Sequence, residues 1–187
     1  MEYDEVISAL EGLERFGIRL GLAAVSVLLE RLGNPHLAYR TVHIGGTNGK
    51  GSVTAMCESI LSKAGYKVGR YTSPHLTEFT ERIVVNGNEI SKEEVIEYFL
   101  KVKEEVDKLK SKNLFISYFE FITAMAFLYF KDRGVDFAVV EVGMGGRLDA
   151  TNVMMPEVAI ITNIGLEHTH ILGKDILFMG LRIMLRF

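Results

Sequence analysis

Residues 43–52 have the sequence HIGGTNGKGS, which carries the strongest fold signal in the chain. An apolar, β-branched run at 41–44 precedes its glycines, and an apolar-periodic segment at 53–64 follows. A strand, a glycine loop, a lysine and a helix in this order are typical of a phosphate-binding site, because loop N–H groups and the positive end of the helix dipole face the anion. Lys50 would add a formal charge at the outer phosphates. The stretch therefore predicts a nucleotide-binding α/β domain.

The loop departs from the general phosphate-loop spacing G-x-x-x-x-G-K-[ST]. That spacing needs a glycine where the chain has Ile44, and a hydroxyl directly after the lysine, where it has Gly51. Ser52 stands one place later, so its role at a metal stays open. The alternative is a strand-to-helix turn that merely needs glycines, although four glycines, a lysine and a hydroxyl are dense for such a turn.

Composition narrows the classes of protein. The net charge of −3 and the pI near 6.0 argue against a nucleic-acid partner. The one cysteine, Cys57, excludes an internal disulfide, fits a reducing cytosol and is expected in the core. The acidic N-terminus lacks the basic start of a signal peptide, and no apolar run approaches the roughly 20 residues that span a bilayer. We expect a cytoplasmic protein without a membrane partner.

The expected elements alternate between helix and strand. Apolar periodicity and stop signals predict helices at 4–15, 21–32, 52–64, 92–109 and 119–130, the fourth behind a capping box at 91–94. Strands are expected at 41–44, 67–72, 137–140 and 158–161, with a small β-ribbon around 82–88. The runs at 137–140 and 158–161 lack alternation, which indicates strands covered on both faces. Together these elements predict a mostly parallel sheet flanked by helices.

Polar or glycine-rich residues follow four of these strands, at the edge where parallel sheets bind ligands. Glu141, directly after a buried run, can hold Mg²⁺ beside phosphates, or it makes an ordinary hydrogen bond at a strand end. The glycines at 143–146 let the backbone approach a ligand closely, with Arg147 and Asp149 nearby.

The five histidines differ in their context. His168, after the last strand, is a candidate metal or phosphate ligand. His36 and His43 are interpreted as structural or surface residues, and His75 and His170 are undecided.

The motifs at 46–52, 71–76, 118–120, 141–152 and 165–168 occur in the same order in folylpolyglutamate synthases. Many bacterial members of that family are also dihydrofolate synthases, and the family belongs to the Mur ligase superfamily. The chain resembles it over roughly residues 17–174. The resemblance implies a P-loop NTPase-like Mur ligase central domain, from which the C-terminal domain is absent.

The resemblance also implies a site. Residues implied to hold the ATP phosphates are Thr47, Asn48, Gly49, Lys50, Gly51 and Ser52. The implied Mg²⁺ ligands are Ser73, Glu141 and His168, so that the metal-bound hydroxyl is that of Ser73, and catalytic roles fall to Lys50 and His168. Substrate contacts are expected from Ser117, Tyr118, Arg82 and Asp149, and the loop at 73–82 resembles the flexible loop over the folate site.

The family reaction attaches glutamate to the carboxylate of folate or dihydropteroate. ATP first phosphorylates that carboxylate, and the glutamate amine then attacks the acyl phosphate. The implied cofactors are ATP and Mg²⁺, with a monovalent cation as a further candidate. The implied partners are these small molecules and the missing C-terminal domain, in a full-length monomer.

The end of the chain departs from the family. No lysine follows Lys174, where the family has an Ile-Ala-x-x-Lys-Ala-Gly-like helix, and residues 176–187 are apolar and basic. We divide the chain into an incomplete ATP-binding domain at 1–175 and an atypical tail at 176–187. The tail is interpreted as the product of a truncation or frameshift, or as an amphipathic end that docks on a partner.

Four functions remain open. The first is an ATP-dependent folate ligase, present here as an N-terminal fragment that is inactive alone. The second is a related ligase for another amino-acid or cell-wall substrate, and the third is a nucleotide-binding module without its own activity. A kinase with the same loop is a weaker fourth. The motifs at 118–120 and 73–75 favour folate.

Overall fold

The computed structural model describes residues 1–14, 17, 21–111 and 113–186, and of residues 170, 172 and 178 it describes only the backbone. These residues form a mixed sheet with the strand order β4-β3-β2-β5-β1-β6. The strands are β1 (Arg40–Gly45), β2 (Val68–Tyr71), β3 (Ile83–Val85), β4 (Asn88–Glu89), β5 (Phe137–Glu141) and β6 (Val158–Ile161). β2, β5, β1 and β6 are parallel, whereas β3 and β4 add an antiparallel ribbon at one edge. The predicted α/β class and the β-ribbon are confirmed.

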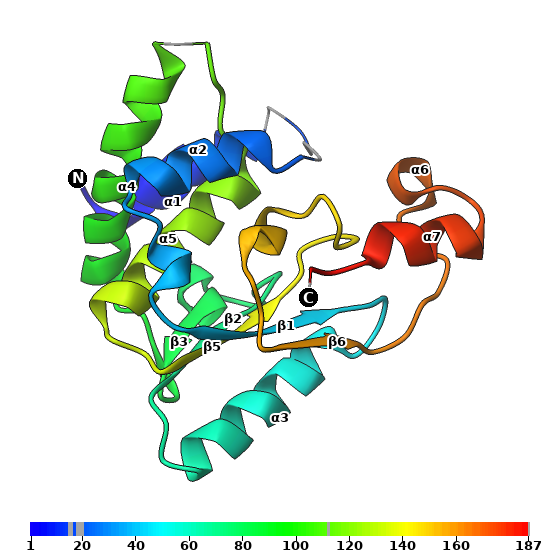
Figure 1. Cartoon of the computed structure of the whole chain (residues 1–187). Helices are drawn as coiled ribbons and strands as arrows, with labels where there is room; N and C mark the ends of the chain where they lie inside the picture. Colours follow the sequence, from blue (N-terminus) through cyan, green and yellow to red (C-terminus); the bar gives the residue numbers. More distant parts are fainter. Residues whose placement is uncertain (15–16, 18–20, 112, 187) are drawn as a thin grey trace.

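Helices cover the two faces unequally (Figure 1). The α-helices are α1 (Tyr3–Glu11), α2 (Ala23–Arg31), α3 (Lys50–Lys63), α4 (Lys92–Lys110), α5 (Tyr118–Asp132), α6 (Thr169–Leu172) and α7 (Ile176–Ile183), and short 3-10 turns lie at Pro35–Leu37, Phe79–Arg82 and Ala150–Val153. The large core joins α5 with α1, α2 and α4 on one face, and a small cluster joins α3 to the other. Helix α5 is buried on all sides from Glu120 to Phe130, as its apolar sequence predicts.

Helix boundaries differ from the predicted ones where backbone geometry decides them. Helix α1 ends at Glu11 rather than at 15, with Gly12 as its C-cap, and α3 begins at Lys50 rather than at 52. Gly65, just after α3, has a left-handed backbone, and the capping box of Ser91 and Glu94 is present as expected. Cys57 packs half-buried against the small cluster between α3 and the sheet.

The expected burial of the strand at 158–161 on both faces is wrong. Within the described residues β6 pairs with β1 and forms the edge of the sheet, where Val158 keeps 50% and Ile161 keeps 40% of its surface exposed. A run without alternation shows only that both faces are apolar, and does not show what covers them. The run at 137–140 is covered, because β5 lies between β1 and β2.

The tail at 176–186 packs against the rest of the chain. Met179, Ile183 and Leu185 are buried, and the backbone N–H of Arg147 donates to the carbonyl of Arg182 at 2.9 Å. The N–H of Arg186 donates to Asn152 Oδ1 at 2.9 Å. Residues up to 186 therefore pack on the glycine-rich segment after β5, while the division at residue 175 stays a prediction. In the described part, no helix is long and apolar enough to cross a bilayer.

Candidate nucleotide and substrate site

Loops that follow β1, β2, β5 and β6 meet at the carboxyl edge of the sheet. The N–H of Thr47 donates to the carbonyl of Asn163 at 2.9 Å, which joins the loop after β1 to the segment after β6. The N–H of Ser73 donates to Glu141 Oε2 at 3.2 Å, which joins the ends of β2 and β5. The convergence expected from the sequence is therefore present in the fold.

The N-terminus of α3 is open to an anion. Its N-cap, Gly49, has φ +80°, no side chain caps the helix, and its first turn carries no acidic residue. In contrast, α4 and α5 both begin with a serine–glutamate capping box. The N–H groups of the first three helical residues (50–52) meet no acceptor among the described residues. Such unpaired donors at the positive end of a helix dipole form an anion site.

The lysine of the loop folds over its own backbone. Lys50 Nζ donates to the carbonyls of Gly46 and Thr47, each at 3.0 Å. Thr47 and Asn48 use their polar groups to fix the loop: Thr47 Oγ1 accepts from Gly165 N at 2.9 Å, and Asn48 N donates to Asn163 Oδ1 at 2.9 Å. The six predicted phosphate-binding residues thus lie together, some as donors and some as supports.

Glu141 lies between this loop and Ser73. Its side chain is buried, and burial raises the pKa of the Glu141 carboxyl, against the lowering effects of the Ser73 N–H, Lys50 and Arg70. A Cβ added at Gly51 would lie 3.7 Å from Glu141 Oε2, which places the carboxylate beside the first turn of α3.

The third predicted metal ligand comes from another segment. His168 precedes α6 with φ +47°, and its side chain is about half exposed, with Nε2 at 3.9 Å from Glu167 Oε1. The described residues contain no group of three His, Cys, Asp or Glu side chains that could hold a metal. A Ser hydroxyl and a Glu carboxylate nevertheless offer the oxygen donors that Mg²⁺ prefers.

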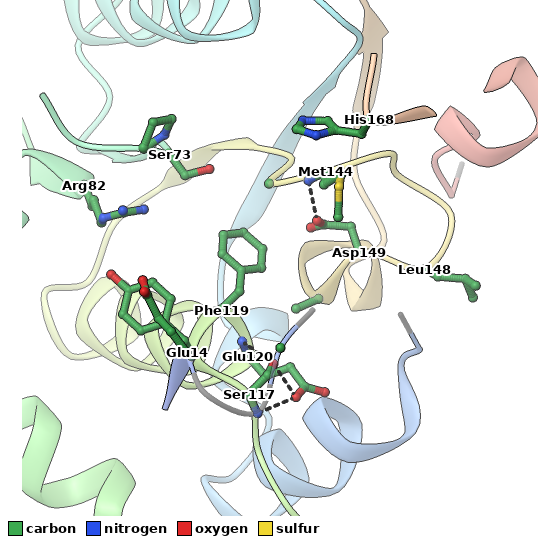
Figure 2. A pocket seen from close by; sticks show the side chains of 15 residues that line it. Glu14, Ser73, Arg82, Ser117, Phe119, Glu120, Met144, Leu148, Asp149 and His168 are labelled. Carbon is green, nitrogen blue, oxygen red and sulfur yellow. Dashed lines mark hydrogen bonds between the residues drawn. The ribbon is translucent and has the colours of Figure 1, made fainter. Parts of the chain in front are cut away.

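A cavity of about 500 Å³ opens next to these residues. Figure 2 shows Ser73 and His168 at one end, Phe119 in the middle and Ser117 at the other end. Its wall also includes Arg82, Tyr118, Met144 and Asp149. All four predicted substrate-binding residues therefore line one cavity, together with two of the three predicted metal ligands.

Arg82 joins this cavity to a neighbouring one of about 570 Å³, whose lining includes Arg82, Tyr118 and Glu14 as well. Its guanidinium lies 5.8 Å from the ring centroid of Tyr118, and its Nε donates to His75 Nδ1 at 2.7 Å. His75, undecided from the sequence, thus supports Arg82. Burial and the charge of Arg82 lower the pKa of His75.

Ser117 is engaged within its own helix. It is the N-cap of α5, and its hydroxyl donates to Glu120 Oε2 at 2.6 Å. The same carboxylate oxygen accepts the N–H of Ser117 at 2.8 Å. The pattern Ser117-x-x-Glu120 is the same capping-box signal as the one at 91–94, whereas the family resemblance implies a substrate contact at Ser117.

Asp149 lines the cavity, but its oxygens are engaged within its own loop. They accept the N–H of Met144 at 2.9 Å, the N–H of Thr151 at 3.0 Å and the hydroxyl of Thr151 at 2.6 Å. Burial raises the pKa of Asp149, and these hydrogen bonds oppose the rise. The geometry therefore favours a supporting role over direct contact with a substrate.

Two further residues of the site lie inside the motifs at 118–120 and 141–152, but neither is predicted individually as a site residue. Phe119 packs against the backbone of Gly143 so closely that an added Cβ would lie 2.4 Å from its ring. Met144 lies between the cavity and the phosphate loop. His36 and His43 are buried, as a structural role requires, and the side chain of His170 lies outside the described part.

The chain is similar to known proteins over most of its length. Residues 44–175 match the Mur ligase middle domain. The chain is 44% identical over 176 residues to the dihydrofolate synthase/folylpolyglutamate synthase of Bacillus subtilis, covering 93% of this chain and 41% of that protein. The crystal structure of folylpolyglutamate synthase from Thermotoga maritima has a TM-score of 0.86 at 44% identity, over 97% of this chain and 41% of the other.

A folylpolyglutamate synthase complex with AMPPCP and folate has a TM-score of 0.90 at 35% identity, covering 98% of this chain and 45% of the other. The chain thus spans less than half the length of the relatives it matches. Because the family model covers most of the sequence, the chain belongs to the Mur ligase middle-domain family.

Proposed function

We propose that the chain is the nucleotide-binding part of an ATP-dependent ligase that adds L-glutamate to folate or dihydropteroate. The observation that carries the proposal is the uncapped N-terminus of α3, which stands beside Lys50 and a buried carboxylate. The adjacent cavity of about 500 Å³ has room for an acceptor substrate. The relatives with the same segment are named for this activity, and one was solved with a nucleotide analogue and folate.

In the proposed reaction, a carboxylate oxygen of the acceptor attacks the γ-phosphorus of ATP, and ADP leaves. The amine of glutamate then attacks the acyl carbon, loses a proton and expels phosphate, which leaves an amide. Phosphorylation is needed because a carboxylate is a poor electrophile. The protein contributes position and charge, which are the main sources of catalysis in phosphoryl transfer.

Three groups of residues have separate roles in this proposal. The N–H groups of residues 50–52 and the charge of Lys50 hold the β- and γ-phosphates. Ser73, Glu141 and His168 would hold Mg²⁺, which when bound neutralises charge on the transferred phosphoryl group. Arg82 and Tyr118, which line the cavity, would contact the acceptor substrate.

Calorimetric titration of Mg-ATP into the 1–187 chain tests the proposal. Lys50→Ala should weaken binding at least about 100-fold, since it removes a charge-assisted contact in a partly desolvated site. Lys63→Ala, at the far end of the same helix, is the matched control and should bind as the unmodified chain does. Equal affinity of Lys50→Ala and the unmodified chain would contradict the phosphate-site assignment.

A nucleotide-binding module without chemistry of its own is the second candidate, favoured because the chain spans only 41% of the Bacillus subtilis relative. A glutamate-ligation assay on the same sample separates the two. Binding with turnover supports a ligase within 187 residues, and binding without turnover supports a module that needs the rest of a longer protein.

A further inference from the structure

A buried chain of three side chains connects the middle of the sheet to the cavity wall. His43 lies in β1, Thr151 in the 3-10 turn after the glycine motif, and Asp149 directly before that turn. His43 Nε2 and Thr151 Oγ1 are 2.8 Å apart, and Thr151 Oγ1 lies 2.6 Å from Asp149 Oδ1. The first two side chains are fully buried, and Asp149 is 5% exposed.

The proton positions in this chain follow from counting donors. The Thr151 hydroxyl has one proton, which it donates to the Asp149 carboxylate. Its oxygen can therefore only accept from His43, so the proton of the neutral imidazole is on Nε2. Nδ1 is then a bare acceptor, and indeed it has no hydrogen-bond partner among the described residues. Burial keeps His43 neutral, with a pKa lowered to about 3.

Asp149 in turn holds the two ends of the loop after β5 together. Its carboxylate accepts the N–H of Met144 at the start of the loop and the N–H of Thr151 at the end. Gly143 and Met144 line both the cavity and the small pocket beside Gly46 and Lys50. The orientation of Asp149 therefore sets the wall at which the two parts of the site meet.

We propose that His43 is a positioning residue, which through Thr151 orients Asp149 and so fixes the backbone at Gly143 and Met144 between the phosphate loop and the substrate cavity. The importance of this wall for ligands rests on the proposed function, whereas the mechanical link does not. A satisfied buried network of this kind specifies one arrangement, and a half-satisfied one does not.

Hydrogen exchange at the Met144 amide, measured on the 1–187 chain, tests the link directly. Thr151→Val keeps the shape of the side chain and removes its hydroxyl, so the Met144 amide should exchange about tenfold faster, the scale of one lost hydrogen bond. Thr151→Ser keeps the hydroxyl and should retain the protection. His43→Leu should behave as Thr151→Val does, and His43→Gln, which offers an amide donor at a similar reach, should restore part of the protection.

The amides of Val139 and Val140 in β5 serve as an internal reference, because they belong to the buried sheet. Faster exchange at Met144 with unchanged exchange at these two supports a positioning role. An equal change at all three amides, or unchanged Met144 exchange in Thr151→Val, would overturn the proposal.

Dihydropteroate binding provides the functional measurement. In Thr151→Val the affinity should fall about tenfold, and in Thr151→Ser it should stay within about threefold of the unmodified chain. If the unmodified chain and all variants fail to bind dihydropteroate, the proposed function is contradicted, while the exchange data still decide the role of His43.

Discussion

The loop after β1 and the loop after β5 are both glycine-rich and stand side by side at the carboxyl edge of the sheet, but they are held in different ways. The loop after β1 is fixed from outside, through partly exposed hydrogen bonds of Thr47 and Asn48 to the segment after β6. The loop after β5 is fixed from inside, by the buried carboxylate of Asp149.

The difference shows which loop is left available for a ligand. After β1, the donors of the first turn of α3 stay unpaired among the described residues, and no side chain competes for them. After β5, the tail occupies the backbone N–H of Arg147 and the side chain of Asn152. This difference supports the proposal that the first loop binds the phosphates and that the second forms a wall of the site.

The largest expected effect is the loss of stability at low pH, which should act through His43 behind the second loop. The pKa of His43 is about 3 in the folded chain and near 6.5 when unfolded, so between these values the unfolded chain binds more protons. The free energy of unfolding should therefore fall by about 1.4 kcal/mol for each pH unit below about 6 on account of this residue.

Urea unfolding at pH 7, 5 and 4 measures this slope. His43→Gln cannot take up a proton, so its stability should depend less on pH than that of the unmodified chain, whatever other groups contribute to both. Parallel pH profiles for the two proteins would show that His43 does not titrate as its burial implies.

The next effect distinguishes the two loops by the way in which an added methyl group harms them. Gly143→Ala would place a Cβ 2.4 Å from the ring of Phe119, and overpacking of this kind costs about 2 kcal/mol. Gly49→Ala meets nothing within 4 Å, but its φ of +80° costs an L-residue about 1 kcal/mol.

A further substitution in each loop region separates the effect of packing from the effect of backbone strain. Phe119→Leu should recover part of the stability lost in Gly143→Ala, because it removes the ring that the methyl group meets. Gly49→Asn should cost less than Gly49→Ala, because asparagine tolerates the left-handed region. Denaturant midpoints measure the stability of these variants. If the double variant Gly143→Ala, Phe119→Leu recovers no stability relative to Gly143→Ala, the packing explanation is excluded.

Much of the first loop could be predicted from the sequence, because its signal is local. Glycines, a lysine and a following helix are contiguous, and the edge on which ligands bind follows from the parallel order of the strands. Glu141 and His168 are metal candidates because each follows a strand, whereas Ser73 and the substrate residues are expected from the family resemblance alone. The structure brings Ser73, Arg82, Tyr118 and His168 to one cavity.

The support of the second loop could not be predicted in this way. His43 and Thr151 are 108 positions apart, and no periodicity or motif relates them before the chain folds. The family resemblance implies a substrate contact for Asp149, and its hydrogen bonds to its own loop could not be predicted, because an acidic residue among glycines gives the same pattern in either role. The prediction that the strand at 158–161 is buried is wrong for a similar reason, because the hydrophobicity of a strand does not identify what covers it.

The smallest expected effect concerns Glu141, which lies between the two loops. Burial raises the pKa of this carboxyl in the folded chain above its usual 4.5. Just above pH 4.5 the folded state therefore binds more protons than the unfolded chain does, and the free energy of unfolding falls as pH rises. At pH 7 without Mg²⁺, Glu141→Gln has no charge to bury. It should therefore melt at a higher temperature than the unmodified chain, by no more than a few degrees.

Mg-ATP should reverse that order. Binding stabilises the folded chain in proportion to the logarithm of ligand concentration over Kd, and the variant would lack one oxygen ligand of the metal. Paired melts of Glu141→Gln and the unmodified chain, with and without Mg-ATP, measure both effects on one sample. A variant that gains stability without metal and keeps the full gain with Mg-ATP would show that Glu141 only supports the backbone at Ser73. A carboxylate that destabilises the fold until a cation arrives is instead expected at a site built for binding.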